Sequence, residues 1–134
     1  AIHTRGNPDC CLILRGGQVP NYTVADVDKV QQCLQQHNLA HTGIVVDASH
    51  GNSGKDWVQQ MKVVHYLATE RHHRVRGIMM ESFLHDGKQS IHDQPLTYGV
   101  SVTDSCIGWE KSEKLLLLLQ QQMSSTSSKN KIKH

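Results

Sequence analysis

Three short apolar runs, each followed by polar residues, recur along the chain. They occupy residues 11–14, 43–46 and 77–80. Apolar runs of about four to eight residues without polar interruption are typical of strands buried on both faces of a parallel sheet. We therefore predict three buried strands.

The segments between and after these runs carry apolar residues at helical spacing. In the first segment, Thr23 and Asp26 are arranged as a capping box with Asp in place of Glu. In the second, Asn52 or Ser53 is the expected helix cap. A polar loop then precedes a leucine-rich helix at about residues 111–123. The apolar faces of the first two helices comprise Val24, Val27, Val30 and Leu34, and Trp57, Met61, Val64 and Ala68.

Strands that alternate with amphipathic helices predict right-handed crossovers and a parallel sheet covered by helices. Three strands do not close such a sheet. A closed (β/α)₈ TIM barrel takes about 250 residues, and this chain has 134. The α/β fold that we expect is therefore the carboxyl-terminal half of such a barrel. Its open sheet edges would make it aggregation-prone or dependent on a partner.

We expect one domain over residues 1–123, followed by a disordered basic tail at 124–134. The serines and lysines of the tail do not bury enough apolar surface to order it. The chain begins with Ala1-Ile2-His3, which is neither an initiator Met nor a signal sequence. We therefore expect the sequence to be a fragment of a longer protein.

Charge and hydropathy exclude several classes of partner. The 14 basic and 12 acidic residues leave a formal charge of +2, too small to predict binding to nucleic acid or a membrane surface. The longest apolar run, residues 115–119, is far shorter than the roughly 18 residues that span a bilayer. The four cysteines form no CxxC pair. With no leader, these thiols predict a cytoplasmic protein in a reducing compartment.

Arg15 follows the first predicted strand and precedes two glycines, Gly16 and Gly17. Glycine lets the backbone come close to an anion, and a guanidinium binds phosphate or carboxylate oxygens through two hydrogen bonds. A phosphate site is one interpretation of this arrangement. The other is an arginine that pairs with a carboxylate on a neighbouring strand.

His50, Glu81 and Asp104 follow the second strand, the third strand and the last loop. Ligands of parallel α/β folds bind at the carboxyl ends of the strands, so these side chains are candidates for one site. One imidazole and two carboxylates suit Mn²⁺, Fe²⁺ or Zn²⁺ without distinguishing among them. Each residue also has a structural interpretation, as a hydrogen-bonded histidine, a turn cap or a partner of Arg15. Asp47, Ser49 and His50 have the residue types of a hydrolytic triad, but Ser49 and His50 alternate in direction and do not readily pair.

Several longer motifs resemble one enzyme family. They are RGNPDC at 5–10, LILRGG at 12–17, PNY at 20–22, DASHGNS at 47–53, ESFL at 81–84, QPLTYG at 94–99 and SVTDSCIGWE at 101–110. Together they resemble the carboxyl-terminal part of type I 3-deoxy-D-arabino-heptulosonate-7-phosphate (DAHP) synthase, and the resemblance extends from about Thr4 to Met123.

The resemblance implies a metal-dependent aldol-type condensation at the start of the shikimate pathway. In that family, C3 of phosphoenolpyruvate attacks the aldehyde of erythrose 4-phosphate, water adds at C2, and phosphate leaves. By motif match, His50, Glu81 and Asp104 are implied as metal ligands, with His50 also lying against phosphoenolpyruvate as a catalytic residue. Arg15 matches the arginine that binds the phosphoenolpyruvate phosphate.

The chain departs from the family pattern in two ways. Cys11 stands where the family usually has His, which we expect to change packing only. The family's fourth metal ligand (a cysteine), its Lys-Pro-Arg-Thr segment and further phosphate-binding residues have no counterpart in this sequence. None of Cys10, Cys33 and Cys106 fits the missing ligand. We therefore expect the chain to be inactive by itself.

The alternatives are a related enzyme that joins phosphoenolpyruvate to arabinose 5-phosphate, whose motifs fit less well, and a non-catalytic half-barrel or metal-binding module. The resemblance also implies feedback inhibition by an aromatic amino acid and a homodimer or homotetramer in the parent protein. Residues 94–99 and 4–7 are most similar to the tryptophan-sensitive branch, but the effector stays open.

Overall fold

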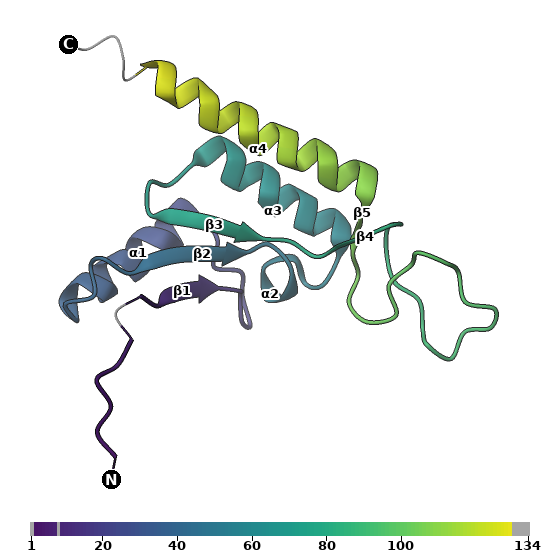
Figure 1. Ribbon diagram of the computed structural model, residues 1–134, viewed down its shortest axis with the longest axis horizontal. Coiled ribbons are helices and arrows are strands. Elements are labelled where there is room, and N and C mark those ends of the chain that lie inside the picture. Colours follow the sequence, from purple (N-terminus) through teal and green to yellow (C-terminus); the bar gives the residue numbers. More distant parts are fainter. Residues whose placement is uncertain (1, 8, 130–134) are drawn as a thin grey trace.

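The computed structural model describes residues 2–7 and 9–129, and it contains a parallel sheet of three strands (Figure 1). The strands are β1 (Cys11–Leu14), β2 (Gly43–Asp47) and β3 (Val75–Met79), in the order β1-β2-β3. Helix α1 (Val24–Gln36) connects the first pair and α3 (Trp57–Glu70) the second. The three predicted strands and two connecting helices are confirmed.

Shorter elements follow the sheet strands. Helix α2 (His50–Ser53) is a single turn after β2, and a second parallel pair consists of β4 (Ser82–Phe83) and β5 (Ile107–Gly108). Helix α4 (Trp109–Lys129) lies beside α3 (Figure 1). None of the described helices is long and apolar enough to cross a membrane.

Both connecting helices cover the same face of the sheet. Ile44 and Val46, two residues apart on β2, point to one side. Ile44 packs in a cluster with residues of α1, including Val27, whereas Val46 packs with residues of α3, including Val64. This one-sided cover is the result expected of two right-handed crossovers made in the same direction.

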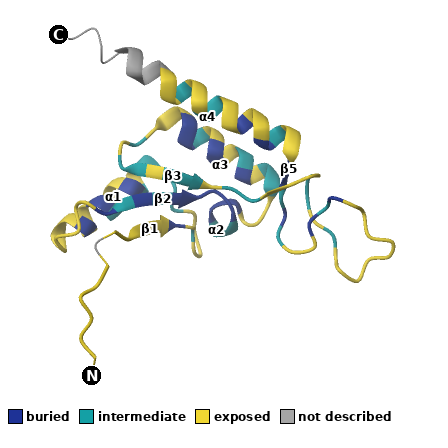
Figure 2. Ribbon diagram, viewed as in Figure 1, coloured by how far each residue is buried: buried dark blue, intermediate teal, exposed yellow. Residues whose placement is uncertain are grey.

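The opposite face of the sheet is open, so the prediction of buried strands is wrong for β1 and for β3, whose residues are all half-buried or exposed. Only Leu14 of β1 is buried, and Ile13 is 45% exposed. Met79 on β3 shares this face and is 44% exposed. Figure 2 shows the contrast between the exposed β1 and the largely buried β2. The apolar pattern predicts the strand but does not reveal which of its faces lacks a covering layer within the described chain.

The helix starts follow from side-chain caps. Thr23 and Asp26 form the predicted capping box at the start of α1. The predicted cap of α3 is wrong, because Asp56 caps it by accepting a hydrogen bond from the Val58 N–H at 2.9 Å. Gly54 adopts a left-handed conformation with φ of 60° and ends α2, so residues 52 and 53 belong to a separate turn.

Helix α4 is longer than predicted at both ends. It starts at Trp109, and its backbone continues through Lys129, past the expected end at Met123. The first six residues of the predicted tail, 124–129, thus continue the backbone of this helix. Serine and threonine are only mildly unfavourable in a helix, so a preceding helical segment can extend through them. The rest of the predicted tail, residues 130–134, lies outside the described part of the chain.

Candidate metal centre

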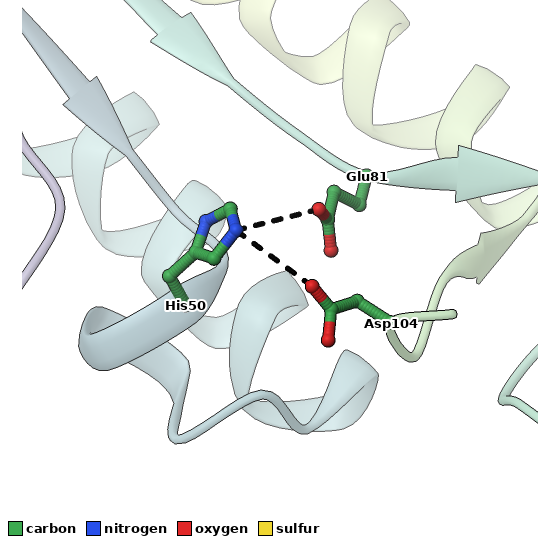
Figure 3. A group of neighbouring side chains, drawn as sticks. All are labelled: His50, Glu81 and Asp104. Atoms are coloured by element: carbon green, nitrogen blue, oxygen red, sulfur yellow. Dashed lines mark ion pairs between the residues drawn. The ribbon is translucent and has the colours of Figure 1, made fainter.

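The turn α2 places His50 at the carboxyl end of β2. His50 has a φ of 47°, in the left-handed region that residues with a side chain seldom adopt. Such backbone outliers persist where the surrounding structure over-determines them, and they concentrate at functional sites. The conformation turns the imidazole toward the ends of the neighbouring strands (Figure 3).

His50, Glu81 and Asp104 converge on one point although three separate segments of the chain carry them (Figure 3). His50 Nε2 lies 3.6 Å from Glu81 Oε1 and 3.8 Å from Asp104 Oδ2. The candidate ligand atoms all lie within 4.8 Å of one another. The structure therefore brings together the three residues that the sequence places at strand ends.

Two further side chains orient this cluster, and sequence reasoning missed both. Asp47 Oδ2 lies 2.8 Å from His50 Nδ1, so a proton on Nδ1 leaves the Nε2 lone pair facing the carboxylates. The buried Ser49 hydroxyl donates to Glu81 Oε2 at 2.8 Å. The signal for both lies in the Asp-x-Ser-His pattern, whose residue types in the sequence alone resemble those of a hydrolytic triad. Here Ser49 contacts Glu81, and Asp47 contacts His50.

The donor set fits a divalent transition metal ion. One neutral imidazole nitrogen and two carboxylate oxygens are ligands that Mn²⁺, Fe²⁺ and Zn²⁺ accept. Two of the three candidate ligands are also held in place, as is usual for metal ligands in proteins. The imidazole and one carboxylate each form a hydrogen bond with a side chain outside the cluster. The side chains of Glu81 and Asp104 are 30% and 33% exposed, so the cluster is open on one side to further ligands.

Cys106 lies near this cluster and is affected by its charges. Burial raises the pKa of the Cys106 thiol, and the negative charges of Glu81 and Asp104 raise it further. The thiol donates to the Asp104 carbonyl oxygen at 3.4 Å. Without a nearby cation, Cys106 is therefore held in its protonated form.

Arg15 is exposed at the carboxyl end of β1. Among the described residues no carboxylate forms an ion pair with its guanidinium. Gly16, with φ of 74°, packs its backbone directly on Gly51, the residue after His50. This contact places the Arg15 loop against the turn that carries His50.

Asn52 connects the Arg15 loop to the turn that carries His50 through hydrogen bonds. Its buried amide nitrogen donates to the carbonyl oxygens of Leu14 and Asp47 at 3.0 and 2.8 Å. Its side-chain oxygen accepts from the Asn21 N–H at 2.8 Å. One side chain therefore joins the ends of β1 and β2 to the loop that follows Arg15.

Replacing Asn52 with Ala removes these three hydrogen bonds and leaves buried backbone groups without partners. We expect the free energy of unfolding to fall by about 2 kcal/mol, as is typical when buried polar groups lose their partners. Urea titration followed by circular dichroism measures the change. Gln59→Ala, which removes an exposed amide on α3, should change it by less than about 0.5 kcal/mol. Equal stability of the two variants would contradict the role of Asn52.

The fold and the cluster together define a class of protein, a parallel α/β protein with a candidate divalent metal centre at the carboxyl ends of its strands. Within that class, the chain belongs to the DAHP synthetase I family, whose family model matches residues 1–117.

Relatives of known name agree with this assignment. The chain is 43% identical to the Tyr-sensitive phospho-2-dehydro-3-deoxyheptonate aldolase of Escherichia coli K12 and 44% identical to the Trp-sensitive one of Enterobacter agglomerans. These matches cover 86% and 84% of this chain but 33% of each relative. The solved structure of the aldolase from Francisella tularensis matches with a TM-score of 0.83 and 38% identity, over 89% of this chain and 36% of that one. The chain thus spans about a third of the length of these relatives.

Proposed function

We propose that this chain carries the metal centre and part of the phosphoenolpyruvate site of a DAHP synthase. The reaction is the condensation of phosphoenolpyruvate with erythrose 4-phosphate to DAHP and phosphate, the first step of the shikimate pathway. The family match and the names of the relatives support this assignment. The observation that carries it is the convergence of His50, Glu81 and Asp104 at the strand ends.

Each residue of the site has a part in this proposal. His50, Glu81 and Asp104 hold the ion, and Asp47 and Ser49 fix the orientations of two of these ligands. A bound Mn²⁺, Fe²⁺ or Zn²⁺ would act as a Lewis acid toward the aldehyde. Arg15, unpaired with any described carboxylate, binds the phosphate of phosphoenolpyruvate. His50 lies against the same substrate.

The open face of the sheet supports a larger architecture. In a (β/α)₈ barrel the helices lie outside and the inner faces of the strands pack on one another. The structure has helices on one face, and the exposed Ile13 and Met79 lie on the other. We propose that β1, β2 and β3 belong to the carboxyl-terminal half of such a barrel, in which this face is the interior.

We extend the proposal to regulation, assembly and location. Relatives carry the names Tyr-, Trp- and Phe-sensitive, which supports an aromatic amino acid as feedback inhibitor of the parent protein. Identities of 40–44% to all three forms do not select one effector. We propose a homodimer or homotetramer for the parent. The four free cysteines support a reducing, cytoplasmic location.

Two binding measurements on the 134-residue chain test the proposal. We expect calorimetry to detect binding of Mn²⁺ and, in its presence, of phosphoenolpyruvate. Arg15→Ala should weaken the binding of phosphoenolpyruvate by roughly tenfold to a hundredfold, the effect of losing hydrogen bonds between charged groups, and leave Mn²⁺ binding unchanged. Arg76→Ala, which removes an exposed arginine near the amino end of β3, is the matched control.

The outcomes separate the candidate functions. If the chain binds Mn²⁺ but does not bind phosphoenolpyruvate, the result would favour a metal-binding module over part of a synthase. Consumption of phosphoenolpyruvate with erythrose 4-phosphate is measured in parallel, with and without Mn²⁺. Turnover by this chain at a rate typical of enzymes would contradict our expectation that it is inactive by itself. Absence of Mn²⁺ binding would contradict the metal centre.

A further inference from the structure

Lys55 stands at the other end of the turn that begins with His50. The Lys55 N–H donates to the His50 carbonyl oxygen at 2.9 Å and closes the turn. Lys55 has a φ of 62°, and it follows Gly54, whose φ is 60°. Glycine adopts this conformation readily, whereas lysine does so only when its surroundings compensate for the strain. The chain thus has left-handed residues with side chains at both ends of one short turn.

The two ends of this turn approach one carboxylate from different sides. His50 Nε2 lies 3.8 Å from Asp104 Oδ2, and Lys55 Nζ lies 3.5 Å from Asp104 Oδ1. Asp104 belongs to a loop 49 residues further along the chain than Lys55. The lysine therefore contacts the oxygen that does not face the imidazole, and the oxygen that faces the imidazole stays available to a metal ion.

Charge balance favours the same arrangement. Asp47, Glu81 and Asp104 bring three carboxylates to the cluster. A divalent ion offsets two of these charges, and the ammonium of Lys55 offsets the third. The Lys55 side chain is 59% exposed, so as an ordinary surface ion pair it would contribute little. A surface ion pair formed by chance does not need a strained backbone, whereas Lys55 reaches Asp104 from a residue with a left-handed φ.

We propose that Lys55 is a positioning residue of the metal centre. By holding Asp104 through Oδ1, it keeps Oδ2 directed toward the site shared with His50 and Glu81. The role resembles those of Asp47 and Ser49, which hold the other two ligands. This inference rests on the proposed metal centre and adds a residue that directs its third ligand.

Metal affinity in the 134-residue chain tests this role directly. Free Mn²⁺ is measured by electron paramagnetic resonance during titration of the chain and its variants. We expect Lys55→Met to weaken Mn²⁺ binding by about 10- to 100-fold, the usual effect of removing a partner of a metal ligand. Lys55→Asn should weaken it as much, because asparagine tolerates the left-handed backbone but is too short to replace the lysine. Lys55→Arg should keep the affinity within about threefold.

Lys62→Met is the matched control, since it removes an exposed lysine of α3 and should leave the affinity unchanged. If the unsubstituted chain binds no Mn²⁺, the metal centre itself is contradicted, and this inference with it. If that chain binds Mn²⁺ and Lys55→Met binds equally well or more tightly, only the role of Lys55 is overturned. Failure of Lys55→Arg to preserve binding would also overturn it, because a second long cation should hold Asp104.

Discussion

Substitution of His50 by Ala is expected to reduce Mn²⁺ affinity by more than about 100-fold. His50 is the only nitrogen donor of the three-residue cluster and lies within 4 Å of both carboxylates, at 3.6 and 3.8 Å. The substitution removes one of the three candidate ligands. It also removes the imidazole that lies near the carboxylates of both Glu81 and Asp104. The expected loss exceeds the 10- to 100-fold effect typical of residues that only orient a ligand. Titration monitored by calorimetry measures the change.

The control for this substitution is His41→Ala. His41 is an exposed histidine just before β2 and lies outside the candidate cluster. The chain contains ten histidines, so the control separates binding at the cluster from weak binding at the surface. If both variants bind Mn²⁺ as tightly as the unsubstituted chain, the cluster is not the metal site.

The second large effect is expected for Gly16→Ala, which should reduce the free energy of unfolding by about 4 kcal/mol. Gly16 has a φ of 74°, where an alanine is strained, and an added Cβ would lie 2.4 Å from the Gly51 carbonyl carbon and 2.5 Å from the Asn52 nitrogen. Strain and overpacking each cost roughly 1–3 kcal/mol. Both atoms in the way belong to the backbone, so no side chain can rotate to make room.

The adjacent Gly17 provides a closely matched control for this prediction. A Cβ on Gly17 would meet no atom within 4 Å, and its φ lies outside the left-handed region. Gly17→Ala should therefore leave stability unchanged or raise it by up to about 1 kcal/mol, through the lower entropy of the unfolded chain. Chemical denaturation of both variants gives the comparison. Similar stabilities for the two would show that the contact between Gly16 and Gly51 is not tight in solution.

The sequence predicted the parts of the fold that depend on local pattern. Apolar runs located β1, β2 and β3, and the Thr23–Asp26 pair located the start of α1. The α2 turn was missed because four residues are too few for a periodic pattern. The turn depends on the left-handed backbone conformations of His50 and Gly54, which the residue types alone do not specify.

The site was predicted in part for a related reason. Residues at the ends of parallel strands meet at one edge of the sheet, so the proximity of His50, Glu81 and Asp104 followed from their positions after the predicted strands. The contacts of Asp47 and Ser49 depend on how the chain turns after β2, and the ion pair of Lys55 joins loops 49 residues apart. Strand order alone predicts neither of these.

Asn52 has a consequence for the energetics of ligand binding. Its side chain holds the Leu14 and Asp47 carbonyls and the Asn21 N–H at once, so displacement of the Arg15 loop is transmitted to the turn that carries His50. If an anion binds at Arg15 and a cation at His50, as we propose, we expect the two binding events to be thermodynamically linked. If the cation raises the affinity for the anion by a given factor, the anion raises the affinity for the cation by the same factor. The free energy of binding both ligands would thus be the same whichever ligand binds first. The dissociation constant measured for each ligand would depend on whether the other is already bound.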